Sequence, residues 1–186
     1  MSKLSPQEMA QILARGLLSF PVTHFDQNHQ FLEGPYREHC AWLLSFKRLT
    51  GLFAAGGTGE FFSLSPAEVG KVVTAAVKET NGQTPVIAGC GYGTAIAVDL
   101  ARSAEAAGAD GLLLLPPYLM VPGQEGLMAH IEAVCKATTV GVIVYNRDNA
   151  VLTEDSLARL CERNPNLVGF RSEEHTSELQ SRETIS

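Results

Sequence analysis

PVIAGCGYGTAIAVDLARSAEAAGADGLLLLPPY, residues 85–118, contains the repeating unit from which the fold is predicted. Its two apolar runs, PVIAGCG from Pro85 and GLLLLPP from Gly111, are continuous rather than alternating, which is typical of parallel strands covered on both faces. Between them, SAEAAGADG at 103–111 has the composition of a helix end followed by a glycine turn. The stretch therefore predicts a strand, a helix and a second strand.

The same alternation extends along the chain in both directions. Four further apolar runs are GLLSFPVT from Gly16, GLFAAGG from Gly51, VGVIVYN from Val140 and LVGF from Leu167. Successive runs begin 26 to 35 residues apart, a spacing typical of βα units. Capping boxes with proline at the first helical position predict helix starts at Ser5 and Ser65, and Thr153 with its two following acids predicts a third.

Two α/β architectures share this spacing, the doubly wound sheet and the eight-stranded barrel. A dinucleotide-binding sheet should carry G-x-G-x-x-G after its first strand, whereas GCGYGT from Gly89 follows the third run and has a different spacing. A barrel needs roughly 250 residues. This chain offers five βα units and the start of a sixth strand, so it stops too early for a complete barrel, and the spacing alone leaves both architectures open.

Composition excludes several classes of function. The chain of 186 residues has a formal net charge of −6, which does not favour nucleic-acid binding. It has no apolar run of about 18 residues and no secretory signal pattern, so we expect no membrane contact and a cytoplasmic location. The four cysteines are far apart and form no metal-ligand pattern with histidine, so we expect reduced thiols and no metal site.

Candidate functional residues follow the predicted strands, because parallel α/β folds place their chemistry at the C-terminal strand ends. GGTGE at 56–60 has the composition of an anion-binding loop, with backbone amides of Gly56 and Gly57 and the hydroxyl of Thr58 as donors. Tyr145 ends the fifth run, and a tyrosine at the end of a buried strand is more often a packed ring with a hydrogen-bonded hydroxyl than a catalytic residue. Arg147 follows it and has the right chemistry to bind a second carboxylate bidentately.

The ordered motifs FPVT, GGTGEFFSLS, LPPY, QEGL, VYN and LVGF resemble the dihydrodipicolinate synthase and N-acetylneuraminate lyase superfamily of class I aldolases and dehydratases. The resemblance covers residues 16–170. GGTGEFFSL and YNRDNAVLTEDSL are most similar to a branch that removes water and carbon dioxide from a six-carbon keto-diacid. The resemblance implies a complete (β/α)8 TIM barrel, so we expect residues 1–170 to be the N-terminal part of a truncated barrel, comprising five βα units and the start of strand six. It also implies a Schiff-base lysine ending strand six, no metal or organic cofactor, and a homo-oligomer, for which it implies a tetramer.

Carried over residue by residue, the resemblance assigns Gly57 and Thr58 to the keto-acid carboxylate and Tyr145 to proton relay. Two departures leave that relay incomplete. Aldolases of the superfamily have two adjacent threonines where this chain has Gly57-Thr58, and a second tyrosine where Leu119 follows Tyr118. A pyruvate-dependent aldolase therefore remains an alternative, less favoured by these residues than the dehydratase.

The largest departure is at the expected lysine, where LVGF is followed by Arg171. A guanidinium with a pKa above about 12 stays protonated and cannot attack a ketone as a desolvated amine does. We therefore expect this chain to lack dehydratase activity. A second alternative, from another class, is a catalytically inactive sensor that binds keto acids.

The final segment, residues 171–186, is polar and has no apolar periodicity. RSEEHTSELQS at 171–181 matches one reading frame of a widely used short-read sequencing adapter. We therefore expect residues 171–186 to be a non-native, disordered tail. Because six strands cannot close the barrel, we also expect unpaired strand edges that make the isolated chain aggregated or molten.

Overall fold

The computed structural model describes residues 4–117, 121–147 and 149–172. Its centre is one parallel sheet in which spatial order follows chain order from β1 to β6. Every apolar run of the sequence forms one of these strands, so the predicted part of a (β/α)8 barrel is confirmed. The strands are β1 (Leu17–Ser19), β2 (Leu49–Ala54), β3 (Val86–Cys90), β4 (Gly111–Leu114), β5 (Gly141–Asn146) and β6 (Leu167–Ser172).

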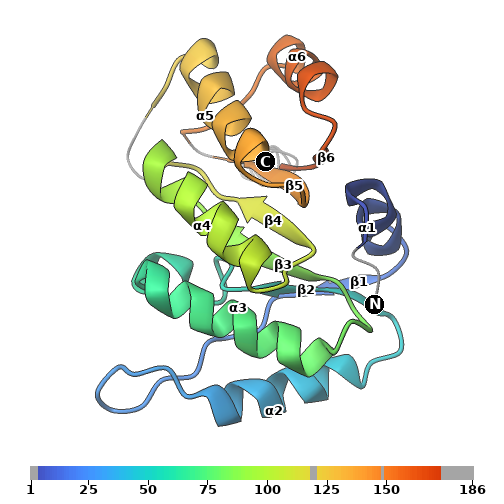
Figure 1. Ribbon diagram of the computed structural model, residues 1–186, viewed down its shortest axis with the longest axis vertical. Helices are drawn as coiled ribbons and strands as arrows, with labels where there is room; N and C mark the ends of the chain where they lie inside the picture. The colour runs from blue at the N-terminus through green and yellow to red at the C-terminus, as the bar shows by residue number, and fades with distance from the viewer. Residues whose placement is uncertain (1–3, 118–120, 148, 173–186) are drawn as a thin grey trace, which may run out of the picture.

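Helices connect the strands, and Figure 1 shows α2, α3, α4 and α5 in a row along one side of the sheet. Of the other two helices, α6 lies next to α5, whereas α1 lies apart from the row and contacts β2, β5 and β6. The helices are α1 (Pro6–Leu13), α2 (Glu33–Leu44), α3 (Pro66–Thr80), α4 (Thr94–Ala106), α5 (Gln124–Ala137) and α6 (Glu154–Arg163), with one 3-10 turn, η1 (Phe61–Ser63).

The predicted helix starts are confirmed by their hydrogen bonds. In α3 the Ser65 hydroxyl accepts from the Glu68 backbone N–H, while the Glu68 carboxylate accepts from the Ser65 backbone N–H at 2.9 Å. The same reciprocal pair opens α1, and the Thr153 hydroxyl caps α6 by accepting from Ser156 N–H. Each cap satisfies backbone donors that have no partner within the helix.

Helix α1 covers the N-terminal ends of two central strands. Met9 is fully buried, and a Cβ added to Gly111 or Gly141 would lie 2.5 Å from the Met9 side chain. These glycines are the first residues of β4 and β5, so the close approach of α1 depends on their missing side chains. The sequence predicted the helix but not this contact.

The two end strands differ from the central ones. Strands β3 and β4 are buried at every residue, whereas the three residues of β1 are exposed or half-buried. In β6 only Leu167 is buried. This is the exposure expected of a sheet in which β1 and β6 each have one neighbouring strand among the described residues.

Strand β6 continues past Phe170, because Arg171 pairs with Tyr145 and Ser172 pairs with Asn146. Residues 173–186, most of the segment predicted to be a non-native tail, lie outside the described residues, and that prediction stays a prediction. None of the described helices is long and apolar enough to cross a membrane.

Candidate active site

A cavity of about 210 Å³ lies at the C-terminal ends of the strands. It brings together Gly57, Thr58, Tyr145 and Arg147, which the sequence analysis selected, with Arg171 at the expected position of the lysine. The complete set of described lining residues is Phe20, Gly57, Thr58, Leu113, Tyr145, Arg147 and Arg171. Gly56 is buried and does not line the cavity, so four of the five predicted site residues line it.

The loop after β2 that carries Thr58 is held by hydrogen bonds to its backbone carbonyls on both sides of that residue. The Thr23 hydroxyl donates to the Gly59 carbonyl at 2.7 Å, and Phe61 N–H donates to the Gly56 carbonyl at 3.1 Å. Its carbonyl at Ala55 packs so closely on β3 that a Cβ on Gly89 would lie 1.9 Å from that oxygen. Gly89 therefore permits the loop to rest against the sheet.

The loop conformation is also unusual in its backbone angles. Ala55 has a φ of 50° and Glu60 a φ of 65°, and both values lie in the left-handed region that non-glycine residues seldom adopt. Such residues persist where surrounding contacts hold them, and they occur often at ligand sites. Here they flank Gly57 and Thr58 and determine how this turn faces the cavity.

Tyr145 and Arg147 are held at the end of β5. Tyr145 is buried, and an Arg147 side-chain N–H donates to its hydroxyl at 3.3 Å, with the guanidinium carbon 5.9 Å from the ring centre. Beyond Arg147, the Asn149 side chain donates to the Pro117 carbonyl at 2.6 Å, and Leu152 N–H donates to the Asn146 side chain at 2.7 Å. The first bond ties the turn after β5 to the segment that follows β4, and the second holds the turn against the last residue of β5.

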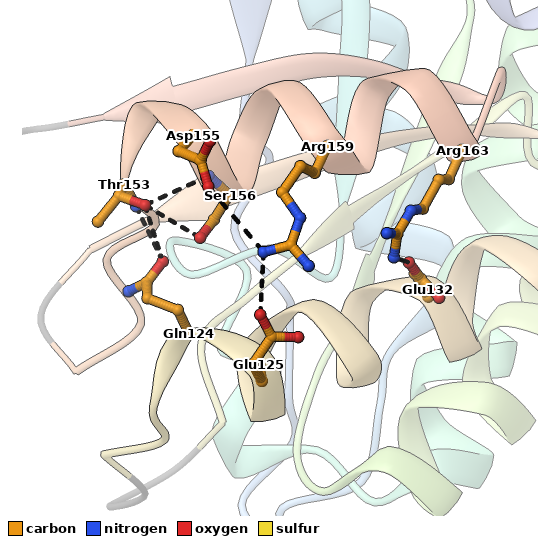
Figure 2. A network of polar contacts seen from close by, with 8 residues as sticks. All are labelled: Gln124, Glu125, Glu132, Thr153, Asp155, Ser156, Arg159 and Arg163. Carbon is orange, nitrogen blue, oxygen red and sulfur yellow. Dashed lines mark hydrogen bonds and ion pairs between the residues drawn. The ribbon is translucent and has the colours of Figure 1, made fainter.

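A polar network between α5 and α6 supports the same turn (Figure 2). The Gln124 side chain donates to the Val151 carbonyl at 2.9 Å and accepts from Thr153 N–H at 3.0 Å. Arg159 pairs with Glu125 at 2.9 Å, and Arg163 pairs with Glu132 at 3.2 Å. The hydrogen bonds from Arg163 and then Lys136 hold the pKa of Glu132 below its usual value. The network thereby fixes where the chain leaves the cavity and begins α6.

Arg171 lies between two aromatic rings of the cavity. Its guanidinium carbon is 5.0 Å from the ring centre of Phe20 and 4.9 Å from that of Tyr145, within the range of cation–π attraction. Phe20 is itself stacked on Phe53 with ring centres 4.6 Å apart. The side chain that replaces the expected lysine therefore points into the cavity.

The lining suits an anionic ligand. It holds two guanidinium groups, the hydroxyls of Thr58 and Tyr145, and none of its described residues is acidic. Within the described part of the chain, no three His, Cys, Asp or Glu residues gather as a metal site would require. Arginine forks bind carboxylates well, so the cavity has the chemistry to hold a small carboxylic acid.

Two lining residues, Phe20 and Leu113, were missed as site residues. Phe20 had a signal, since it begins the FPVT motif at the end of the first apolar run, whereas Leu113 lies inside a uniform leucine run. The departure at Tyr118 and Leu119 falls outside the described residues.

Curated proteins of several bacteria are similar to this chain over almost its whole length. A protein of Bradyrhizobium sp. (strain ORS 278), described as a probable 5-dehydro-4-deoxyglucarate dehydratase, is 63% identical over 98% of this chain and 58% of its own length. A protein of Saccharopolyspora erythraea with the same description is 64% identical over 92% of this chain and 55% of its own length. The chain thus spans less than two thirds of these relatives.

Solved structures show the same fold. A dihydrodipicolinate synthase from Agrobacterium tumefaciens has 30% identity and a TM-score of 0.81, covering 88% of this chain and 56% of that one. An E. coli prophage protein of the dihydrodipicolinic acid synthase family, solved in complex with pyruvate, has 25% identity and a TM-score of 0.80, covering 86% and 55%. The profile of the dihydrodipicolinate synthetase family matches residues 13–185. The chain belongs to the dihydrodipicolinate synthetase family.

Proposed function

We propose that the enzyme to which this chain corresponds removes water and carbon dioxide from 5-dehydro-4-deoxy-D-glucarate, giving 2,5-dioxopentanoate in glucarate catabolism. The observation that carries the proposal is the cavity that unites Thr58, Tyr145, Arg147 and position 171. The descriptions of the curated relatives support the choice of substrate. Family resemblance further supports a homotetramer in the cytoplasm that works without a metal or organic cofactor.

Each polar group has a role in this proposal. Thr58 and the amides of Gly56 and Gly57 hold the carboxylate next to the ketone, and Arg147 binds the distal carboxylate of the keto-diacid. Tyr145 moves protons at the reacting carbons, and its contact with Arg147 favours a hydroxyl oriented toward the ligand. The burial of Gly56 behind the lining makes its contribution the weakest of the three donors.

The reaction needs an amine at position 171. A neutral lysine amine would add to the ketone and release one water, giving a protonated imine that acidifies the C–H of the neighbouring carbon. Loss of that proton would give an enamine, whose electrons expel the hydroxyl of the next carbon as a second water once it has taken up a proton. Arg171 cannot take this role, because its guanidinium is protonated and its nitrogen lone pairs are delocalised. Loss of a covalent nucleophile costs on the order of 10⁶ in rate, or about 8 kcal/mol, so we propose that this chain is inactive.

A second candidate function is non-covalent binding of a keto acid, as in a sensor. The observation that favours it is the Arg171 guanidinium between Phe20 and Tyr145, facing the same cavity as Arg147. Two guanidiniums suit a dicarboxylate that is held by charge and hydrogen bonds alone. Resequencing the gene from independent DNA separates the candidates: a lysine codon after GF supports the dehydratase, and an arginine codon followed by the same tail supports the sensor.

The enzymatic test uses a protein that we name the completed chimera: residues 1–172 of this chain, followed by the segment of the Bradyrhizobium relative that comes after its match to Ser172. The Arg171→Lys variant should release carbon dioxide from 5-dehydro-4-deoxyglucarate, whereas the chimera with Arg171 should not. Release of pyruvate instead would support the aldolase alternative. Absence of both products would refute the proposed reaction.

A further inference from the structure

A small cavity lies behind the wall of the candidate active site, and we name it the rear cavity. It leaves about 10 Å³ for the centre of a water-sized sphere, which is room for one water molecule and too little for a larger ligand. Tyr145 lines both the rear cavity and the larger site cavity, so this residue lies between the two. Whatever fills the rear cavity therefore supports Tyr145 from the side away from the site.

His130 of α5 brings a polar group to the rear cavity. The residue is only 8% exposed, and apart from Tyr145 every other described lining residue has an apolar side chain. The Nε2 atom of His130 is buried and has no hydrogen-bond partner among the described residues. Buried polar nitrogens are nearly always hydrogen-bonded, because an unpaired one costs the full free energy of its removal from water. The histidine therefore requires a partner that the described part of the chain does not supply.

The other ring nitrogen of His130 is held by α4. Its Nδ1 lies 2.9 Å from the hydroxyl oxygen of Thr94, the first residue of that helix. Thr94 does not line the rear cavity, whereas His130 does, so the ring faces α4 with Nδ1 and the cavity with the edge that carries Nε2. Helices α4 and α5 pack side by side (Figure 1), and the bond between them keeps the ring in this orientation.

The segment after β4 offers hydrogen-bond acceptors to the same cavity. Leu115, Pro116 and Pro117 all line it. The two prolines have no N–H group, and the Leu115 N–H donates to the Cys90 carbonyl at 2.8 Å. The backbone of residues 115–117 therefore has only carbonyl oxygens to offer. A molecule that joins this segment to His130 must donate a hydrogen bond to it.

We propose that the rear cavity binds one water molecule, which accepts a hydrogen bond from Nε2 of His130 and donates one to a backbone carbonyl of residues 115–117. In this arrangement the Thr94 hydroxyl donates to Nδ1, so the hydrogen of the neutral ring is on Nε2. Burial lowers the pKa of His130, which keeps the ring neutral near pH 7 and available in this tautomer. Two polar partners are the minimum for a buried water.

The water makes His130 a positioning residue for Tyr145. His130 does not line the site cavity, so it can act there only through a neighbour. With water in the rear cavity, Tyr145 cannot move away from the site, and its hydroxyl stays 3.3 Å from the Arg147 guanidinium. Catalytic groups work when they are held within about 0.5 Å of the productive geometry. The role of Tyr145 in proton transfer rests on the proposed function, whereas the water site does not.

The experiment begins with a crystal structure of the completed chimera at a resolution that shows ordered water. We expect one water within hydrogen-bond distance of His130 Nε2 and of a carbonyl oxygen of residues 115–117. This readout needs no activity, so it decides the water site even if the proposed reaction is wrong. A direct bond from Nε2 to a protein atom, or a rear cavity without an ordered water, would overturn the proposal.

Two amide variants separate the two nitrogens of the histidine. The side-chain amide of glutamine reaches as far as Nε2, whereas that of asparagine reaches only as far as Nδ1. His130→Gln should therefore keep both the water and the position of Tyr145. His130→Asn should keep a partner for Thr94 but lose the water, and the Tyr145 ring should shift toward the rear cavity. An unmoved Tyr145 in His130→Asn would show that the water does not position it.

Kinetics of the same substitutions in the Arg171→Lys variant of the chimera test the effect on the reaction. With 5-dehydro-4-deoxyglucarate, His130→Asn should lower kcat by about ten-fold, because a small displacement of a catalytic group costs up to about 100-fold. KM should change by less than about two-fold, since His130 does not line the site cavity. His130→Gln should keep kcat within about three-fold of the unchanged protein. Equal losses of kcat in both variants would overturn the positioning role.

Failure of this proposal and failure of the proposed function give different results. An Arg171→Lys chimera that releases neither carbon dioxide nor pyruvate refutes the proposed reaction, and the crystal structures still decide the positioning of Tyr145. If His130→Asn does not fold, the water in the unchanged chimera and the kcat of His130→Gln decide. The water together with a retained kcat supports the proposal, and the loss of either one overturns it.

Discussion

Replacing Gly89 with alanine in the completed chimera should both destabilise the fold and disturb the carboxylate loop. The new Cβ would lie 1.9 Å from the Ala55 carbonyl oxygen and 2.9 Å from the ring of Phe61. An ordinary contact between carbon and oxygen is about 3.3 Å, so the loop must move by about 1.4 Å. Phe61 is fully buried and its ring packs against those of Phe62 and Tyr92.

The expected loss in the free energy of unfolding is about 3 kcal/mol, at the upper end for overpacked sites, because the nearest obstacle is backbone. The loop shift also displaces Thr58, so pyruvate binding should weaken. Urea unfolding followed by circular dichroism measures the first effect. Gly57→Ala is the control, since a Cβ there meets nothing within 4 Å, and it should change stability by less than about 0.5 kcal/mol. If Gly89→Ala is as stable as this control, the argument from close packing is wrong.

Three further predictions concern the same chimera. Thiol titration of the folded protein at pH 8 should label Cys161, which is exposed. The buried Cys40, Cys90 and Cys135 should stay unmodified until denaturant is added, because burial raises the pKa of each thiol. Rapid labelling of any of these three would contradict the prediction. Burial lowers the pKa of His130, so the unfolded state takes up a proton before the folded state does as the pH falls below about 6.5, and the free energy of unfolding decreases with falling pH. His130→Gln should therefore flatten the dependence of the melting temperature on pH between pH 7 and 5. An unchanged dependence would contradict this prediction. Glu68→Ala should lower the free energy of unfolding, measured with urea, by about 1 kcal/mol, because it removes the capping box of α3. Equal stability of the variant and the unchanged chimera would show that the cap contributes little.

The elements that the sequence predicted are those with local signals. Each strand followed from a continuous apolar run, and the starts of α1, α3 and α6 followed from side chains that bond to their own helix. Helix α2 gave no such signal, because its cap residue, Leu32, makes no side-chain hydrogen bond. Local patterns therefore predicted the order of elements and some of their boundaries.

Contacts between distant segments were less accessible from the sequence. The packing of Met9 on Gly111 and Gly141 joins α1 to two strands more than 100 residues away, and no local pattern specifies it. In the site, the order of the strand ends predicted that Thr58, Tyr145 and Arg147 would meet, because parallel strands place their C-terminal ends at one edge. The stacking of Arg171 against Phe20 depended on side-chain directions that composition does not fix.

The central claim is that position 171 faces a keto-acid cavity and lacks only an amine for imine chemistry. The most direct measurement is borohydride reduction in the presence of pyruvate, followed by peptide mass spectrometry, on the completed chimera and on its Arg171→Lys variant. The account predicts a reduced pyruvate adduct on the lysine introduced at position 171 and no adduct in the chimera that retains Arg171. A folded Arg171→Lys variant without an adduct, or an equal adduct in the chimera that retains Arg171, would contradict it.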